Sequence, residues 1–281
     1  MSVELIQQRM NAYSCNTTLE EEHALREITQ EVVLAALGRT PFFQKAAFHG
    51  GTCLRIFHRL NRFSEDLDFA LKQPDNSFSL DPYLKSVSAE LTAYGYDFEI
   101  QDRSQSGQTV KKAFLKDQSI GKLLTLNYRI PTGPMRKIRV KLEVDSRPPP
   151  GAKLENNYLD FPFVSSVSTF DLPSLFAGKL HALLCRQYTK GRDWYDFIWY
   201  TARRVSPNYR LLTSALAQTG HRENTTPIGR DECMNMLTEK INSMDWDAAR
   251  SDVERFVKPD ELASLELWSR ELFISLCKKI Q

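Results

Sequence analysis

Two aspartates separated by one residue, Asp66 and Asp68, stand at the start of an apolar run in the segment RFSEDLDFAL. A strand would place both carboxylates on one face, with their Cα atoms about 7 Å apart. Carboxylates at that spacing can bind hard cations such as Mg²⁺, which prefer oxygen ligands. Two such ions can stabilise the entering and leaving oxygens of an in-line displacement. The pair therefore predicts metal-dependent phosphate chemistry.

Two glycines and a threonine precede this pair in the segment FHGGTCLRIF. Gly50 and Gly51 allow the backbone to approach a phosphate closely, and Thr52 opens a predicted helix whose free N–H groups attract anions. Each signal alone is weak, because a DxD sequence can cap a turn and a glycine pair can form a hairpin. Their order within one strand, helix, strand unit indicates a site for a magnesium-bound triphosphate.

A third carboxylate would complete a two-metal site, and a later segment supplies two candidates. In IRVKLEVD, apolar residues alternate with charged ones, which is the pattern of a half-buried strand. Glu143 and Asp145 share the outward face of that predicted strand. We choose Glu143 as the third carboxylate and keep Asp145 as the alternative.

A second group of charged residues lies in the segment PSLFAGKLHALLCRQYTKGRDWYDFIWY. Lys179 borders the apolar stripe of a predicted helix, where its ammonium group could contact a phosphate. Lys190 and Gly191 are interpreted as the end of that helix. In the next helix, Asp193 could reach a metal, a ribose or the lysine, whereas local ion pairs are the simpler explanation for Asp196.

The surrounding pattern predicts the elements that must position these residues. A helix should begin at TTLEEE, and further helices should cover residues 52–60 and 80–94. Strands are expected over residues 45–49, 67–71, 96–101, 112–115, 123–130 and 138–144. Beyond residue 171 the pattern is helical almost throughout. These features predict an α+β protein with a mixed-sheet domain over residues 1–170 and a helical C-terminal domain over residues 171–281.

The composition bounds the class of protein. The 281 residues are 42% hydrophobic and 26% charged, as in ordinary globular proteins. No apolar run is long enough for a membrane span, and the N-terminus does not resemble a secretion signal, so a cytoplasmic location is expected. Five scattered cysteines do not suggest a zinc site. Residues 103–147 contain eleven Lys or Arg against three Asp or Glu, which favours a polyanionic partner.

The segment GGTCLRIFHRLNRFSEDLDF resembles the first motif of the AbiEii/AbiGii toxin family, and AGKLHALLCRQYTKGRDWYDF is similar to its later lysine and RDxYD motifs. The strand VKLEVDSR resembles the segment that carries the third carboxylate in such proteins, which favours Glu143. The family is a branch of the nucleotidyltransferase superfamily related to DNA polymerase beta. The resemblance extends over roughly residues 48–197, more than half of the chain.

The resemblance implies a polymerase-beta-like nucleotidyltransferase core and the toxin role of a type IV toxin–antitoxin system in abortive infection and phage defence. It implies two Mg²⁺ ions, an NTP substrate, an RNA acceptor with tRNA 3′ ends as the best precedent, and a cognate antitoxin encoded alongside. The metal ligands would be Asp66, Asp68 and Glu143; the catalytic residues would also include Lys179 and Asp193; and the nucleotide would be bound by Gly50, Gly51, Thr52, Arg55 and Lys179.

Two other functions are compatible with the sequence. The same core could transfer the nucleotide to a small molecule, such as an aminoglycoside, or to a protein hydroxyl. Alternatively, the chain could be a nucleic-acid-binding or partner-binding module whose site is vestigial. Neutralising basic residues of the 103–147 stretch should abolish RNA modification but barely affect a small acceptor, and a vestigial site would consume no nucleotide.

Overall fold

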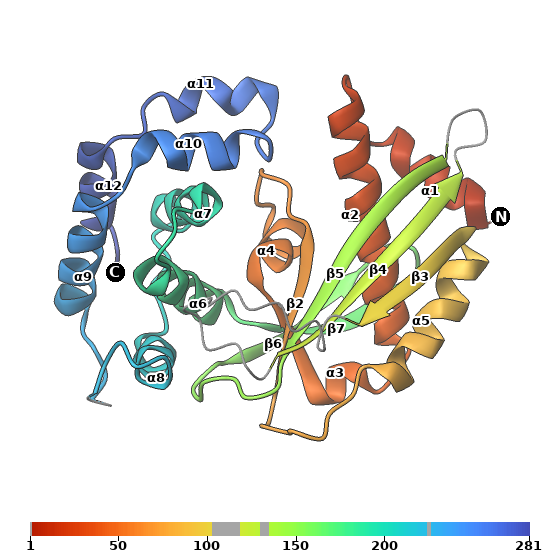
Figure 1. Ribbon diagram of the computed structural model, residues 1–281, viewed down its shortest axis with the longest axis horizontal. Helices are drawn as coiled ribbons and strands as arrows, with labels where there is room; N and C mark the ends of the chain where they lie inside the picture. The colour runs from red at the N-terminus through yellow and green to blue at the C-terminus, as the bar shows by residue number, and fades with distance from the viewer. Residues whose placement is uncertain (1, 103–118, 130–134, 224–225) are drawn as a thin grey trace.

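A computed structural model describes residues 2–102, 119–129, 135–223 and 226–281 (Figure 1). Most of the basic stretch over residues 103–147 lies outside the described side chains, as does the strand predicted over residues 112–115. The role of this stretch in binding a polyanion therefore stays a prediction.

A seven-stranded mixed sheet forms the first part of the molecule, with the strand order β3-β4-β5-β2-β1-β7-β6. Its strands are β1 (Ala46–His49), β2 (Asp66–Leu71), β3 (Tyr96–Asp102), β4 (Ser119–Arg129), β5 (Met135–Asp145), β6 (Leu154–Leu159) and β7 (Ser165–Phe170). The β2–β5 and β1–β7 pairs are parallel, and the other neighbours are antiparallel. The strands predicted around both aspartates and around Glu143 are therefore confirmed as β2 and β5.

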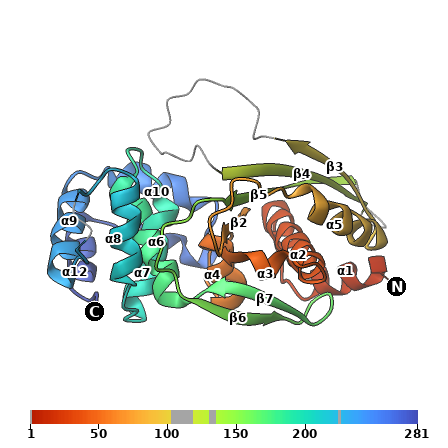
Figure 2. The same ribbon diagram turned by 90° about the horizontal axis from the view of Figure 1, so that it is seen from below.

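Four helices pack on this sheet, namely α2 (Thr18–Gly38), α3 (Phe42–Lys45), α4 (Gly50–His58) and α5 (Asp81–Ala93), and α1 (Ser2–Asn11) packs on α2. The TTLEEE segment starts α2 as predicted, because Thr17 and Glu20 form a reciprocal capping box. The long helix α2 is largely buried, since the sheet curves around it with β3, β4 and β5 on one side and β6 and β7 on the other (Figure 2). The resulting core fixes the buried face of β2 and β5.

Helices make up the part that follows residue 171, drawn from green to blue in Figure 1. They are α6 (Leu172–Cys185), α7 (Gly191–Ala202), α8 (Tyr209–Gln218), α9 (Arg230–Asn242), α10 (Trp246–Glu254), the 3₁₀ helix η1 (Pro259–Glu261), α11 (Leu262–Leu265) and α12 (Arg270–Cys277). Every strand of the described residues precedes this part. Its division from the sheet as a separate domain stays a prediction. No helix in the described part of the chain is long and apolar enough to cross a membrane.

Two features of the chain differ from the sequence-based expectation. Strands β6 and β7 occupy a region for which no strand was predicted, because LENNYL and SSVSTF are rich in Asn and Ser and lack a clear apolar alternation. Helix α6 ends at Cys185, and Gly191 begins α7 instead of ending the preceding helix. A Cβ atom on Gly191 would lie 1.8 Å from the carbonyl oxygen of Ala249, so glycine is required for the close packing of α7 on α10.

Candidate active site

The carboxylates at the start of β2 face those of β5 across a parallel pairing. Asp66 is opposite Lys141, and Asp68 is opposite Glu143. Directly paired residues of neighbouring strands point to the same face of a sheet. The next residue of β2, Leu67, is fully buried on the other face. Asp66, Asp68 and Glu143 therefore lie on one face, as the alternating pattern predicted.

The register also separates the two candidates for the third carboxylate. Glu143 is the direct neighbour of Asp68, and its carboxylate pairs with the Nζ of Lys141. Asp145 is opposite Ala70, two pairs further along the strands from the Asp68–Glu143 pair, and its Oδ1 accepts a hydrogen bond from the Arg147 N–H at 2.9 Å. This geometry favours Glu143.

The charges around Asp66 fit a hard divalent cation. Burial, together with the charges of Asp68 and Glu143, raises the pKa of Asp66 to about 6, while the charge of Lys141 opposes this shift. A cation would relieve this repulsion, and carboxylate oxygens are the donors that Mg²⁺ prefers. Among the described residues no group of three or more His, Cys, Asp or Glu side chains is placed to hold a metal ion by itself. One or two carboxylates together with substrate phosphates commonly hold Mg²⁺.

The two glycines bring the backbone directly against this carboxylate cluster. Gly50 has a φ of +81°, and a Cβ atom there would lie only 2.4 Å from Oδ2 of Asp68. A Cβ atom on Gly51 would lie 2.8 Å from Nη2 of Arg62 and 3.0 Å from Oγ of Ser64. Gly50 is therefore the point where the glycine loop touches Asp68, and its lack of a side chain sets the position of the carboxylate.

Replacing Gly50 by alanine should lower nucleotide transfer by about 100-fold or more, because the new methyl group would overlap the Asp68 carboxylate and push it out of position. The positive φ adds a strain of about 1–3 kcal/mol for any residue with a Cβ atom. Steady-state rates and thermal unfolding of the variant test this expectation.

Gly178→Ala is the matched control for that variant. Gly178 lies inside α6, and a Cβ atom there would meet nothing within 4 Å. Alanine should therefore leave transfer unchanged and stabilise the helix by about 0.5–1 kcal/mol. Equal activity of the two alanine variants would contradict the role given to Gly50.

Thr52 and Arg55 make structural contacts in the first turns of α4. Thr52 is fully buried, and its hydroxyl donates to the carbonyl oxygen of Asp66. Arg55 donates to Oε2 of Glu27 at 2.8 Å and to the carbonyls of the loop after α4. These contacts support the carboxylate strand and the loop, and the nucleotide contacts expected for both residues stay a prediction.

Lys179 lies in a buried network of ion pairs between α6, α7 and the segment before β2. Its Nζ is 2.6 Å from Oδ1 of Asp193 and 2.8 Å from Oδ2 of Asp196. Asp196 also accepts two hydrogen bonds of 2.6 Å from Arg62, and both side chains are almost completely buried. Asp193 therefore contacts Lys179, which was one of the three partners considered for it from the sequence.

This network differs from the local pairs expected for Asp196, because Arg62 is 134 residues earlier in the chain. Arg186 completes it, with its Nε 3.3 Å from Oδ2 of Asp193. Burial alone would raise the pKa of Asp193, but the charges of Lys179, Arg186 and Lys190 hold it below its usual range. The carboxylate therefore stays ionised.

Arg62 and Arg186 were missed because only the three-dimensional structure brings them to their partners. The same holds for Glu65, which contacts Arg26 at 3.3 Å and Arg192 at 3.1 Å. The sequence feature that could have pointed to Arg62 is its position four residues before Asp66. These pairs connect the segment before β2 with α2 and α7.

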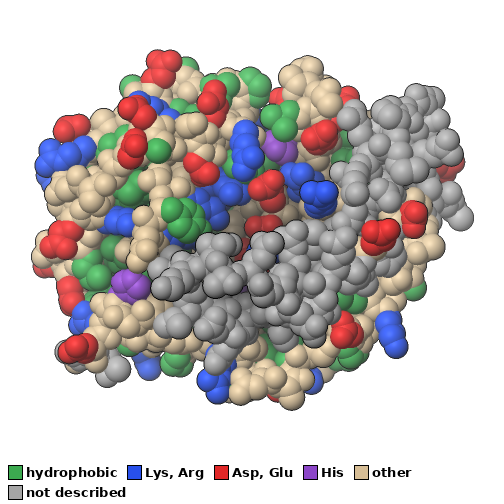
Figure 3. Space-filling view, viewed as in Figure 1, with side chains coloured by type: hydrophobic (Ala, Val, Ile, Leu, Met, Phe, Trp, Pro, Cys, Tyr) green, Lys and Arg blue, Asp and Glu red, His purple; other side chains and the backbone are tan. Residues whose placement is uncertain are grey.

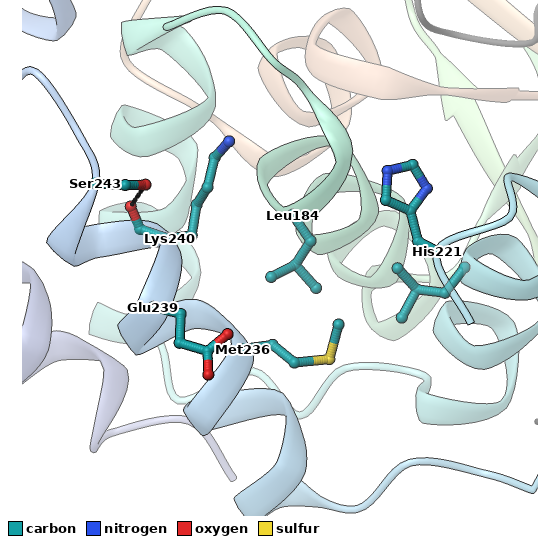
Figure 4. Close-up of a pocket in the computed structure, with 7 residues that line it drawn as sticks. Leu184, His221, Met236, Glu239, Lys240 and Ser243 are labelled. Atoms are coloured by element: carbon teal, nitrogen blue, oxygen red, sulfur yellow. Dashed lines mark hydrogen bonds between the residues drawn. The ribbon is translucent and has the colours of Figure 1, made fainter. Parts of the chain in front are cut away.

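Basic and acidic side chains lie next to one another around a hollow near the centre of the face shown in Figure 3. A cavity of about 300 Å³ lies elsewhere, in the helical part (Figure 4). It is lined by Leu184, Leu216, His221, Met236, Glu239, Lys240 and Ser243. None of the residues expected to bind metal or nucleotide belongs to this cavity.

His181 lies two residues after Lys179 but serves the packing of the helical part. Its Nε2 is 3.0 Å from Oγ1 of Thr219, and burial, with the charges of His221 and Arg186, lowers its pKa to about 4. In the unfolded chain the ring has a pKa of about 6.5, so between pH 6.5 and pH 4 the unfolded state binds a proton that the folded state does not bind. The free energy of unfolding should therefore fall as the pH drops through this window, by about 2 kcal/mol between pH 7.5 and 5.

Urea unfolding of the wild type and of His181→Gln at several pH values isolates this contribution, because all other titrating groups are common to both proteins. The stability advantage of the wild type should shrink as the pH falls. An advantage that does not change with pH would contradict the assignment.

A glycine loop between two strands, an alternating aspartate pair and a third carboxylate on the adjoining parallel strand define a nucleotidyltransferase with a polymerase-beta-like core. Residues 32–270 match the family model described as the nucleotidyl transferase AbiEii toxin of a type IV toxin–antitoxin system. This match covers most of the chain, so the protein belongs to the AbiEii family. Membership implies an NTP substrate and an antitoxin partner, and it confirms the predicted fold class and enzyme class.

Solved structures from Helicobacter pylori are among those that match this chain. One is a candidate nucleotidyltransferase, with a TM-score of 0.47 and 18% identity over 91% of this chain and 96% of that protein. Another is JHP933, with a TM-score of 0.43 and 16% identity over 92% of this chain and 94% of that protein. No curated protein matches the sequence.

Proposed function

We propose that this nucleotidyltransferase transfers a nucleoside monophosphate from an NTP to RNA in a Mg²⁺-dependent reaction, with the 3′ end of a tRNA as the acceptor. In this proposal the reaction is the toxic activity of the type IV system and serves phage defence. The contact of Gly50 with Asp68, whose strand neighbour is Glu143, carries the proposal. It brings backbone that carries no side chain, at the start of α4, beside the carboxylates that would bind the metal in this proposal.

Asp66, Asp68 and Glu143 would hold Mg²⁺, which supplies stabilisation of charge on the entering and leaving oxygens when bound. The glycine loop would hold the triphosphate. Lys179 would contact it with one N–H, since an ammonium group has three donors and the carboxylates of Asp193 and Asp196 take two. The carboxylates of Asp193 and Asp196 thereby fix the direction in which the Lys179 ammonium group points.

In the transfer step, the 3′ oxygen of the acceptor forms a bond to the α-phosphorus of the NTP. The bond between that phosphorus and the bridging oxygen breaks, and pyrophosphate leaves with the electron pair. The proton of the acceptor hydroxyl passes to the carboxylate of Glu143, the neighbour of Asp68. The abundance of Lys and Arg over residues 103–147 supports RNA as the acceptor, because phosphate contacts dominate affinity for nucleic acids.

The test is incubation of the protein with bacterial tRNA, Mg²⁺ and each of the four NTPs labelled at the α-phosphate. Label should enter tRNA, and it should disappear when EDTA is added or when the tRNA 3′ diol is oxidised with periodate beforehand. Label on oxidised tRNA would refute the 3′ end as the acceptor. Label only on protein or on a small molecule would refute RNA.

A further inference from the structure

An aromatic pair lies on the face that carries the candidate metal ligands. His49 ends β1 immediately before Gly50, and it is the antiparallel partner of Asp68. Its ring stacks on Phe170, with centroids 5.1 Å apart and an interplanar angle of 17°. Because paired residues share a face, His49 points to the same side of the sheet as Asp68.

Phe170 is the last residue of β7, the strand on the other side of β1. The register of this parallel pair sets Phe48 opposite Thr169, so His49 and Phe170 are the next neighbours. Four side chains thus form a row across β7, β1, β2 and β5, namely Phe170, His49, Asp68 and Glu143. With neighbouring strands about 4.8 Å apart, Phe170 lies about 10 Å along this row from Asp68.

The two rings are only partly buried, in contrast to the preceding pair of residues on the same strands. Phe48 and Thr169 point to the other face and are fully buried in the core. His49 and Phe170 keep part of their surface in contact with solvent. Aromatic surface is therefore partly exposed on the face of the sheet that carries Asp68 and Glu143, next to Gly50.

We propose that His49 and Phe170 form a stacking platform for the base of the incoming nucleotide. The inference rests on the proposed function, in which Gly50 and Gly51 hold the triphosphate beside Asp68. The ribose separates a base from its α-phosphate by a distance comparable to two strand spacings, so the base reaches the aromatic pair. Every nucleobase has a π-face that stacks on aromatic rings, and His49 adds a polar edge that can discriminate among bases.

Equilibrium binding of an NTP and of inorganic tripolyphosphate, both with Mg²⁺, separates the base from the phosphates. His49→Leu and Phe170→Leu should each weaken NTP binding by about tenfold, the loss expected for one stacked base. Binding of tripolyphosphate should not change. His49→Phe keeps an aromatic ring and should retain most of the affinity, with a changed preference among the four NTPs.

Tyr83→Leu is the matched control, since Tyr83 is a partly buried member of another stacked pair, with Phe78, outside the row. It should bind both probes like the wild type. Unchanged NTP binding in the two leucine variants would overturn the platform and leave the proposed function intact. A raised KM for RNA without a change for NTP would overturn it as well. A wild type that binds neither probe would overturn both proposals.

Discussion

Asp68→Asn should abolish nucleotide transfer while the protein remains folded. Asp68 is the residue that contacts Gly50 and neighbours Glu143, so in the proposed site it faces both the metal and the triphosphate loop. Removing one preorganised group that stabilises the charge of a transition state costs a factor of about 100 to 1000. Asparagine keeps the shape but loses the charge that binds a hard cation. Transfer of labelled nucleotide to RNA measures the loss.

The unfolding temperature of Asp68→Asn should be equal to or above that of the wild type. The charge of Asp68 raises the pKa of Asp66, which means that the two carboxylates repel each other in the folded state. Asp145→Asn is the control on the same face of β5, and it should retain activity, whereas Glu143→Gln should lose it. Loss of activity in Asp145→Asn but not in Glu143→Gln would reverse the assignment of the third carboxylate.

Asp196→Asn should destabilise the protein by about 3–5 kcal/mol, the range for breaking a buried ion pair. The side chain of Asp196 has no exposed surface, and its carboxylate binds Arg62 and Lys179 at once. The variant leaves the Arg62 guanidinium buried without its charged partner. Urea unfolding followed by circular dichroism measures the change.

Arg62→Met should destabilise the protein less than Asp196→Asn, because Lys179 still neutralises the remaining carboxylate. Asp247→Asn provides the control at an exposed pair with Arg250, where the Asp247 side chain is 86% exposed. Exposed pairs contribute less than about 1 kcal/mol. A similar small effect of Asp196→Asn would show that the network does not hold the two parts of the molecule together.

The parts of the fold that the sequence predicted well are those with a local physical signal. The alternation of Ile138, Val140, Leu142 and Val144 with charged residues gave β5, and all four apolar side chains are buried. The capping box at Thr17 gave the start of α2. Strands β6 and β7 were missed because their sequences are polar, and pairing within the sheet stabilises them in spite of weak propensity.

The candidate site divides in the same way. Asp66, Asp68 and Glu143 could be assembled from alternation and from the resemblance, because their arrangement follows from strand pairing. The hydrogen-bond partners of Arg55 and Thr52 could not be predicted, since they are set by how α4 packs on α2 and β2. The ion pair between Arg62 and Asp196 joins positions 134 residues apart, and no local pattern in the chain predicts it.

The dependence of Lys179 on late residues has a consequence for the cell that makes this toxin. A ribosome releases β2, with both aspartates, long before it adds Asp193 and Asp196. A nascent or prematurely terminated chain that stops before α7 leaves Arg62 unpaired and gives Lys179 neither of the carboxylates that direct it. Interrupted translation therefore yields fragments in which the network of Arg62, Lys179, Asp193 and Asp196 cannot form.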